Sequence, residues 1–191
     1  DVLVGLDNNL VEKARSEAVL ASYKPALADF ISPDLRLSDD WLLTPYDWGY
    51  FAFIFDTASP LAPPKSLEDL TDKRFNKKLI IMDPRMSTPG LGFLVWTMKV
   101  YGSDWQSYWE RLKPSILTLA PGWDTGYGLF TSGEAPLVIS YTTSPAYHVE
   151  YDKTERYQAL IFDQGHVTQI EGLGLVKGAK NTKEAQAFID F

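Results

Sequence analysis

The stretch KLIIMDPRMSTPGLGF, residues 78–93, contains the signals of a strand, a tight turn and a helix in immediate succession. Its apolar run predicts a strand that is buried on both faces, which is typical of a parallel sheet. Ser87 or Thr88 can serve as the N-cap of the following helix, and Pro89 suits the first helical turn, where no backbone N–H is needed. A strand that leads directly into a helix is the unit from which α/β folds are built.

Strand and helix signals alternate along the rest of the chain. Further strands are predicted at residues 2–6, 115–119 and 135–141, and the near-continuous apolar run of the first is typical of a buried parallel strand. Helices are predicted over residues 9–22, from residue 66, over 90–101 and over 125–131. This alternation predicts an α/β fold with a mainly parallel sheet. The helix after Pro89 is apolar on most faces, so it is expected to lie buried between layers and to end at Gly102 as its C-cap.

An aromatic run interrupts this alternation and divides the chain. YDWGYFAFIFD, residues 46–56, predicts a long strand that leaves one lobe and enters another, and three prolines then make a stiff turn. Residues 166–171 alternate apolar and polar side chains, as a strand returning to the first lobe would. Two crossings predict two lobes: residues 1–45 form part of the first lobe, 46–165 form the second, and 166–191 return to the first.

The composition excludes several kinds of site. A formal charge of −7 and an isoelectric point near 4.8 argue against a nucleic-acid surface, which needs clustered basic residues. The chain has no cysteine, which excludes disulfides and thiolate metal sites, and two histidines are too few for a multi-histidine site. No apolar run approaches the roughly 20 residues of a membrane-spanning helix. Both ends look cut, so the chain is expected to be an internal segment of a larger protein.

Three loops carry polar and aromatic residues directly after predicted strands. They are DPRMSTPG, PGWDTGYG and SYTTSPAYH, residues 83–90, 121–128 and 140–148. In a parallel sheet these loops converge on one cleft at the carboxyl edge, where open α/β folds bind ligands. The first loop offers a helix N-terminus, which suits a phosphate or carboxylate. The other two offer hydroxyl groups and aromatic faces, and such faces attract flat or cationic ligands.

Other interpretations of these residues stay open at this point. Ser87 and Thr88 can merely cap a core helix, and each aromatic residue taken singly is explained by core packing. The first loop lacks the lysine of a P-loop and the glycine spacing of a dinucleotide-binding loop. His148 lies near Ser144 and Glu150, but no nucleophile elbow is present, and this histidine is more typical of a surface or hydrogen-bonded residue. No enzyme signature is found.

Five stretches together resemble the thiamine-binding periplasmic proteins, which deliver the vitamin to an ABC importer and belong to the two-lobed solute-binding proteins. These stretches are DVLVGLDNNL, PYDWGYFAFIFD, DPRMSTPGLGF, GWDTGYGLF and SGEAPLVISYTTSPAYH. They occur in the family's order and span most of the chain. The resemblance implies a two-lobed, periplasmic-binding-protein-like α/β fold of type II, with one lobe nearly complete and the other partial. A family member would also carry a leading segment with a signal peptide and a trailing segment with a further aromatic residue.

The resemblance also implies roles for individual residues. Ser87 and Thr88 correspond to a Ser-Thr pair at the phosphate or hydroxyethyl end of thiamine, and Tyr147 corresponds to a ring-stacking tyrosine. Asp83 and Arg85 are expected to brace the turn rather than to touch the ligand. The other ligand-binding residues that the resemblance implies are Trp123, Tyr141, Thr142, Thr143, Ser144 and Pro145.

The function that the resemblance implies is capture of thiamine, or of its phosphate esters, between two lobes in the periplasm. The implied protein is a non-enzymatic monomer without cofactor or metal, and its partner is an ABC transporter permease in the inner membrane. One alternative is another solute, such as ferric iron with a carrier anion, a polyamine or an organophosphate. Tyr141 and Tyr147 are not adjacent, as the ligands of iron-binding members usually are, which counts against iron. A thiamine-precursor biosynthetic enzyme on the same fold is the second alternative, with His148 as its one candidate.

Overall fold

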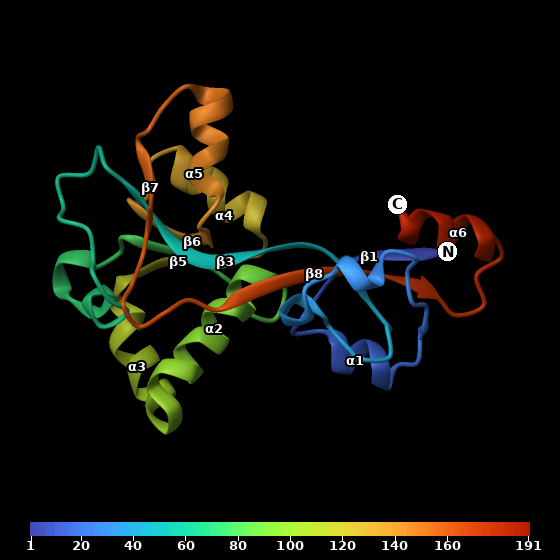
Figure 1. Cartoon of the computed structure of the whole chain (residues 1–191). Helices are drawn as coiled ribbons and strands as arrows, with labels where there is room; N and C mark the ends of the chain where they lie inside the picture. Colours follow the sequence, from blue (N-terminus) through green and yellow to red (C-terminus); the bar gives the residue numbers. More distant parts are fainter. The chain divides into compact units, whose positions relative to one another are not determined.

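The structure is a computed structural model that describes all 191 residues (Figure 1). Its contacts divide the chain into two compact units. The first unit comprises Asp1–Trp48 and Gln169–Phe191, and the second comprises Gly49–Thr168. The long aromatic strand β3, Thr44–Asp56, contributes residues to both units. None of the helices has the length and apolar character needed to cross a membrane.

The second unit is built on a sheet in the order β3-β6-β4-β5, and β7 (Tyr157–Leu160) pairs with the other edge of β3. Strand β4 (Leu79–Met82) runs parallel to both β5 (Ile116–Ala120) and β6 (Leu137–Tyr141). Strand β3 is antiparallel to β6 and to β7. The predicted α/β fold is therefore confirmed, but parallel pairing is limited to β4, β5 and β6, because only these strands are joined by the helical crossovers that parallel pairing requires.

Helices cover both faces of this sheet (Figure 1). Helices α2 (Thr88–Tyr101) and α3 (Trp105–Leu112) lie on one face, and α4 (Trp123–Thr131) and α5 (Ser144–Tyr147) lie on the other. A π-helical turn, η7 (His148–Asp152), continues α5. Short 3-10 helices complete the connections of both units: η1 Ala28–Phe30, η2 Pro33–Leu35, η3 Glu68–Thr71, η4 Lys73–Phe75, η5 Gly102–Asp104 and η6 Lys113–Ser115.

Helix α2 ends where the sequence predicted, but it is covered on one side only. Gly102 follows its last residue with φ at 55°, a left-handed conformation that glycine adopts without strain. Phe93 and Trp96 are buried against the sheet, whereas Met98 is 44% exposed. The expectation that α2 lies buried between layers is therefore wrong. The helix predicted from residue 66 is also reduced, to the four residues of η3.

The core of the second unit is rich in aromatic rings from β3 and α2. The ring centroids of Phe53 and Phe93 lie 5.1 Å apart in an edge-to-face arrangement, and Trp96 stacks on Phe53 at 6.3 Å. Such pairs add about 0.5–1.5 kcal/mol beyond the burial of their area. The aromatic run that divides the sequence thus supplies the main packing surface of this unit.

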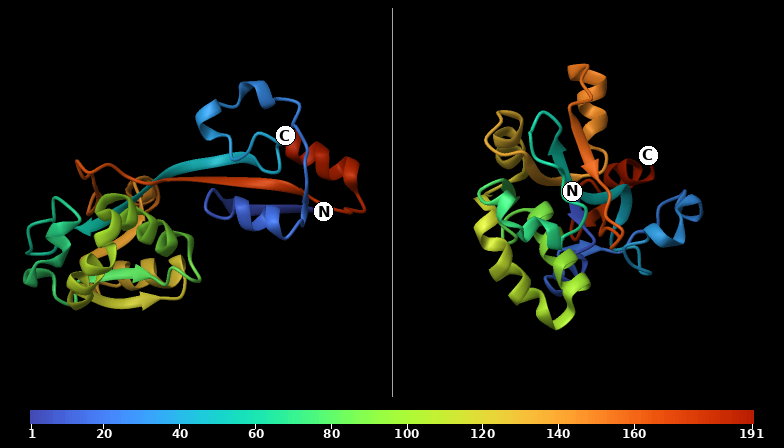
Figure 2. Two further views of the ribbon diagram at one scale, coloured as in Figure 1. Left: turned by 90° about the horizontal axis from the view of Figure 1, so that it is seen from below. Right: turned by 90° about the vertical axis from the view of Figure 1, so that its left-hand side faces the viewer.

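The first unit contains β1 (Val2–Asp7), β2 (Leu20–Ala21) and β8 (Thr168–Val176), with β1 and β2 both antiparallel to β8. Its helices are α1 (Val11–Ser16) and α6 (Thr182–Asp190). The two views of Figure 2 show α6 near the end of β8, and Leu175 of β8 packs there against two buried residues of α6.

Three predictions for the first unit are wrong. The strand at residues 2–6 is antiparallel and largely exposed, with Val4 54% accessible, so its apolar run does not report burial on both faces. The helix predicted over 9–22 ends at Ser16, because Ala18 takes a left-handed conformation with φ at 50°. The return strand begins at Thr168 rather than at residue 166. His166 instead donates from Nδ1 to the carbonyl of Phe51 at 2.8 Å.

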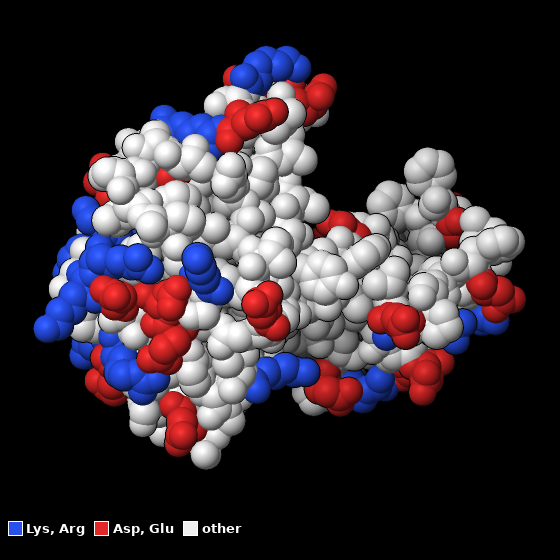
Figure 3. Space-filling view, turned by 60° about the vertical axis from the view of Figure 1, so that its left-hand side comes forward, with Lys and Arg blue, Asp and Glu red and all other residues white.

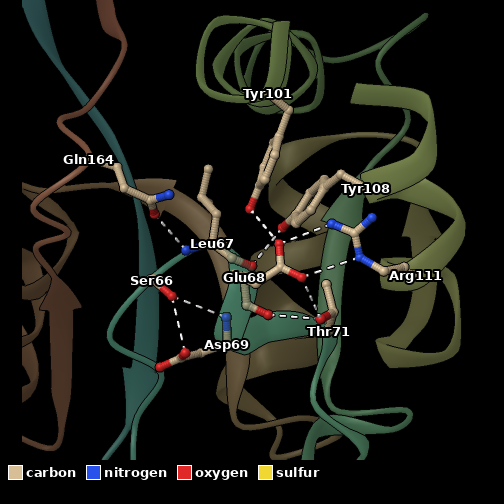
Figure 4. Close-up of polar contacts among 9 residues, drawn as sticks. All are labelled: Ser66, Leu67, Glu68, Asp69, Thr71, Tyr101, Tyr108, Arg111 and Gln164. Atoms are coloured by element: carbon tan, nitrogen blue, oxygen red, sulfur yellow. Dashed lines mark hydrogen bonds and ion pairs between the residues drawn. The ribbon is translucent and has the colours of Figure 1, made fainter. Parts of the chain in front are cut away.

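Glu68 connects η3 to the helices α2 and α3 (Figure 4). Its carboxylate accepts hydrogen bonds from the Arg111 guanidinium at 3.0 and 3.2 Å and from the Tyr101 hydroxyl at 3.1 Å. The Arg111 hydrogen bonds are the main reason that the pKa of Glu68 lies below its usual range. The neighbouring N–H of Leu67 donates to the Gln164 side chain at 2.9 Å, so residues far apart in the sequence meet at η3.

Charged side chains are mixed on the face shown in Figure 3, where acidic and basic residues alternate without a continuous basic patch.

The ion pair of Asp56, the last residue of β3, has a much less exposed carboxylate than the ion pair of Glu68. Asp56 accepts from Arg156 at 2.7 and 2.6 Å, and its side chain is only 9% exposed. Arg156 is also the main reason that the pKa of Asp56 lies below its usual range.

We predict that Arg156→Gln lowers the free energy of unfolding by about 2–4 kcal/mol, because it leaves a buried carboxylate without its partner. Arg111→Gln, which breaks the same kind of two-point contact at the half-exposed Glu68, is expected to cost less than about 1 kcal/mol. Urea unfolding at neutral pH measures both values. Equal losses in the two variants would contradict this prediction.

The same pair predicts a dependence on pH. Since the folded-state pKa of Asp56 is lowered, its stabilisation is complete above the ordinary carboxyl pKa of about 4 and is lost as the pH falls through the folded-state pKa. The difference in stability between the wild type and Arg156→Gln should therefore narrow as the pH falls below about 4. Urea midpoints measured at pH 7 and pH 3 test this.

Gly90 in the first turn of α2 allows the helix to approach β4. A Cβ atom at this position would lie 2.4 Å from the Met82 carbonyl oxygen, and backbone atoms cannot yield easily. We predict that Gly90→Ala lowers the free energy of unfolding by about 1–3 kcal/mol through overpacking. Gly128→Ala in α4, where a Cβ meets nothing within 4 Å, is the control and should be neutral or stabilising by up to about 1 kcal/mol. Urea unfolding would contradict the prediction if Gly90→Ala were also neutral.

Candidate functional site

The segments that follow β4, β5 and β6 lie at one edge of the sheet. These three strands are parallel, and helices α2, α4 and α5 begin shortly after their carboxyl ends. The expectation that the three loops leave the sheet at the same edge is therefore confirmed. This edge is where open α/β sheets place their ligands.

The turn before α2 is braced by Asp83 and Arg85, as predicted. The Asp83 carboxylate accepts from the backbone N–H of Arg85 at 2.9 Å and pairs with its guanidinium at 2.5 Å. The Arg85 hydrogen bonds lower the pKa of Asp83 to about 2. Ser87 occupies the N-cap position, but its side chain makes no capping hydrogen bond. The prediction that Ser87 can stand at the N-cap is thus confirmed, whereas capping by its hydroxyl group is not observed.

Helix α4 presents an aromatic pair at this edge. Trp123 and Tyr127 are one helical turn apart, and their rings stack at a centroid distance of 4.9 Å and an angle of 21°. The His148 ring is nearly parallel to that of Tyr127, at 5.7 Å and 19°, and lies at its hydroxyl edge. Tyr147 meets His148 edge-on at 5.6 Å. Trp123 keeps 37% of its surface exposed, so the open end of this stack is an aromatic face available to a ligand.

These rings line a cavity of about 770 Å³ that lies entirely within the second unit. Such a volume is typical of a small-molecule site. Two carboxylates, Asp124 and Asp152, belong to its lining, whereas no lysine or arginine does. The remaining lining residues are Trp123, Tyr127, Gly128, Thr131, Tyr141, Thr143, Ser144, Tyr147 and His148.

Two serines support the aromatic pair. The indole N–H of Trp123 donates to Ser140 Oγ at 2.8 Å, and Ser140 Oγ lies 2.8 Å from Ser144 Oγ. Ser144 Oγ also accepts from the backbone N–H of Tyr141 at 3.3 Å. Ser140 is fully buried at the end of β6, so the sheet itself fixes the orientation of the Trp123 ring.

His148 is buried, which corrects the expectation of a surface residue, although it is hydrogen-bonded as expected. Only 3% of its surface is exposed. Nε2 lies 2.9 Å from the Tyr127 hydroxyl, and Nδ1 lies 2.7 Å from the Asp152 carboxylate. Burial raises the pKa of Tyr127 to about 12, and a hydrogen bond with Ser144 acts in the opposite direction. His148 begins the π-helical turn η7, His148–Asp152, which brings Asp152 to its ring.

The structure brings together part of the predicted site. Five of the nine predicted residues line the cavity, namely Trp123, Tyr141, Thr143, Ser144 and Tyr147. The other four do not line it: Ser87 and Thr88 lie at the start of α2, Thr142 donates its backbone N–H to Tyr50, and Pro145 occupies the first turn of α5.

Six lining residues were absent from the predicted site: Asp124, Tyr127, Gly128, Thr131, His148 and Asp152. Helical spacing carries a signal for three of them, because residues four apart lie on the same side of a helix. Tyr127 is four residues after Trp123, and Asp152 is four residues after His148. No group of three or more histidine, aspartate or glutamate side chains is close enough together to hold a metal ion.

We predict that Ser140→Ala lowers the free energy of unfolding by about 1–3 kcal/mol, because it leaves the Trp123 N–H without its partner. The tryptophan emission of the folded protein should change as well. Ser132→Ala, which removes an exposed hydroxyl at the end of α4, is the control and should change neither property. An unaltered emission spectrum of Ser140→Ala would contradict the prediction.

Comparison with known proteins agrees with this architecture. The family model described as bacterial extracellular solute-binding protein matches residues 1–191. The chain is 43% identical over 192 residues to the thiamine-binding periplasmic protein of Brucella abortus and 42% identical over 191 residues to that of Escherichia coli. Each match covers all of this chain and 57% or 58% of the relative, so the chain spans less than two thirds of the relatives' length.

Solved structures show the same fold. A periplasmic thiamin binding protein superposes with a TM-score of 0.93 at 42% identity, over all of this chain and 59% of that one. An iron-bound protein from Pseudomonas aeruginosa superposes with a TM-score of 0.83 at 18% identity, over all of this chain and 63% of that one, and this likeness concerns the fold alone. The two-lobed periplasmic-binding-protein fold that the sequence predicted is thus confirmed, and this chain belongs to the bacterial extracellular solute-binding protein family.

Proposed function

We propose that the protein captures thiamine, and also its phosphate esters, in the periplasm and delivers it to an ABC transporter permease. The observation that carries this proposal is the stacked Trp123–Tyr127 pair in a cavity that contains two carboxylates and no basic side chain. The identity of 41–43% to several thiamine-binding periplasmic proteins supports it. Because the family is one of solute-binding proteins, we further propose that the protein is not an enzyme.

The chemistry of thiamine suits such a cavity. Thiamine joins a flat aminopyrimidine ring to a thiazolium ring with a permanent positive charge. A cation over an aromatic face gains about 0.5–2 kcal/mol, and the gain increases when water is excluded. The exposed face of Trp123 and the ring of Tyr147 offer such faces, while Asp124 and Asp152 add negative charge nearby.

We place the polar end of the ligand at the start of α2. This helix has 14 residues, and the positive end of its dipole lies at its start, which favours an anion or a hydroxyl group. Ser87 and Thr88 would add hydroxyl groups there. This assignment rests on the resemblance to the family and on the common sheet edge of α2, α4 and α5.

Three alternatives are less well supported. A polyamine would match the acidic lining, but it has no flat ring for the aromatic stack. A biosynthetic enzyme would need a free reactive group, whereas both ring nitrogens of His148 are already within hydrogen-bond distance of Tyr127 and Asp152. Ferric iron would need oxygen ligands that converge, and Tyr141 and Tyr147 belong to different elements, β6 and α5.

Calorimetric and fluorescence titrations with thiamine test the proposal. We expect heat of binding and a change of tryptophan emission in the wild type, because the ligand meets the exposed face of Trp123. Trp123→Phe should lose most of the emission change and bind about threefold to tenfold more weakly, through a poorer aromatic face. Trp105→Phe in α3, which lies on the opposite face of the sheet, is the matched control and should behave as the wild type.

Three results would contradict the proposal. One is the absence of both heat and emission change at millimolar thiamine. Another is an equal loss of affinity in the two tryptophan variants, which would place the ligand elsewhere. The third is tighter binding of putrescine or spermidine than of thiamine, which would favour the polyamine alternative.

A further inference from the structure

The polar groups beneath the aromatic cavity form two short chains of hydrogen bonds. In the first, the Tyr127 hydroxyl lies 2.9 Å from His148 Nε2, and His148 Nδ1 lies 2.7 Å from the Asp152 carboxylate. This chain joins α4 to the π-helical turn η7. In the second, the Trp123 indole donates to Ser140 Oγ, which lies 2.8 Å from Ser144 Oγ.

The Asp152 end determines the positions of the first protons. A carboxylate only accepts hydrogen bonds, so His148 Nδ1 must carry a proton and donate it. In the neutral imidazole, Nε2 is then an acceptor, and it must receive the hydrogen of the Tyr127 hydroxyl.

The direction of the first chain follows from these positions. Since the Tyr127 hydrogen is directed to His148, the Tyr127 oxygen can only accept from any further partner. Both bonds point from Tyr127 toward Asp152, and bonds aligned in this way polarise and strengthen one another. The second chain does not take its direction from Asp152, because either serine hydroxyl can be the donor in it.

We propose that Asp152, acting through His148, sets the direction of the first chain and thereby makes the Tyr127 hydroxyl an acceptor toward the ligand. Because its hydrogen is used within the chain, Tyr127 offers only lone pairs to a ligand. Tyr127 lines the cavity together with the carboxylates of Asp124 and Asp152. This part of the cavity therefore takes a cationic or hydrogen-bond-donating group rather than a phosphate.

This inference rests on the proposed function where it concerns the orientation of thiamine. The aminopyrimidine and thiazolium rings would occupy the cavity, and a phosphate ester would have to extend away from it. His148 and Asp152 are in this sense positioning residues, since they act through Tyr127. The direction of the chain itself is a property of the unliganded protein and can be tested without a ligand.

The first experiment determines the protonation of His148 in the ligand-free protein. Two-bond ¹⁵N–¹H correlation spectra at pH 7.5 distinguish the two neutral tautomers and the imidazolium. We expect a neutral His148 with its proton on Nδ1. A proton on Nε2 alone, or on both nitrogens, would overturn the proposal, whatever the protein binds. Failure of thiamine binding with the expected tautomer would overturn only the assignment of the ligand.

The second experiment compares three variants in titrations with thiamine and thiamine monophosphate. Asp152→Ala should weaken the binding of both ligands by the same factor, about tenfold. Glu150→Ala removes a carboxylate from the same turn that has no contact with His148, and it should change the binding of either ligand less than twofold. Asp152→Asn keeps an acceptor for Nδ1–H without the charge, so it should retain more affinity than Asp152→Ala.

Each outcome of this comparison is decisive. Equal affinities of Asp152→Ala and Asp152→Asn would mean that charge alone acts, which would overturn the role of His148. Equal losses in Asp152→Ala and Glu150→Ala would overturn it in the same way. Tighter binding of thiamine monophosphate by Asp152→Ala than by the wild type would show that the phosphate lies in this cavity, which would overturn the proposed selectivity.

Discussion

The parallel pairing of β4 with β5 on one side and with β6 on the other is the constraint on which the candidate site depends. It requires the chain to cross over the sheet after each strand, and each crossover begins with a helix at the carboxyl edge. The pairing therefore places the starts of α2, α4 and α5 at one edge, although they are far apart in the sequence. The tight packing of α2 on β4 at Gly90 belongs to the same constraint, because a larger residue there would move the helix away from the strand.

The cavity gains its chemical character from residues that the sheet holds in place. Ser140 is the next-to-last residue of β6 and anchors the Trp123 ring, while Tyr127 stacks on Trp123 and is held at its hydroxyl by His148. An aromatic surface that is already ordered loses little conformational entropy when a ligand binds. The acidic carboxylates lie beside it, so the cavity combines rigid apolar faces with negative charge. This combination distinguishes it from the start of α2, where backbone N–H groups favour negative charge on the ligand.

Much of the second unit could be predicted from local sequence patterns. The apolar run before Asp83, the proline in the first turn of α2 and Gly102 at its end all act within a few residues, so each predicts its element. The strands β5 and β6 and the turn braced by Asp83 and Arg85 were predicted for the same reason. In the first unit, the apolar run of β1 predicted burial on both faces, and this failed because burial depends on neighbours that a local pattern does not contain.

In the candidate site too, local patterns predicted some residues, whereas others depend on contacts that a local pattern does not contain. Trp123, Tyr141 and Tyr147 follow strands, and this position alone suggested a role at the sheet edge. His148 and Asp152 were not predicted as site residues, although their spacing of four residues is a signal, because their contact forms in a π-helical turn that a single sequence does not predict reliably. The direction of the Tyr127–His148–Asp152 chain is still less accessible, because it requires the distances among three side chains.

The hydrogen bonds of His166 have a consequence for how the chain can diverge. This side chain donates to the carbonyl of Phe51 and accepts from the backbone N–H of Phe162. It therefore holds the segment before β8 next to β3, as backbone hydrogen bonds hold two paired strands together. Both partners are main-chain groups, so changes in the neighbouring side chains do not remove them. A replacement must offer a donor and an acceptor on opposite sides of a small flat group, which neither an aliphatic nor a charged residue does. The residues that can replace His166 in evolution are therefore limited by the hydrogen bonds that their side chains can form rather than by the volume of those side chains.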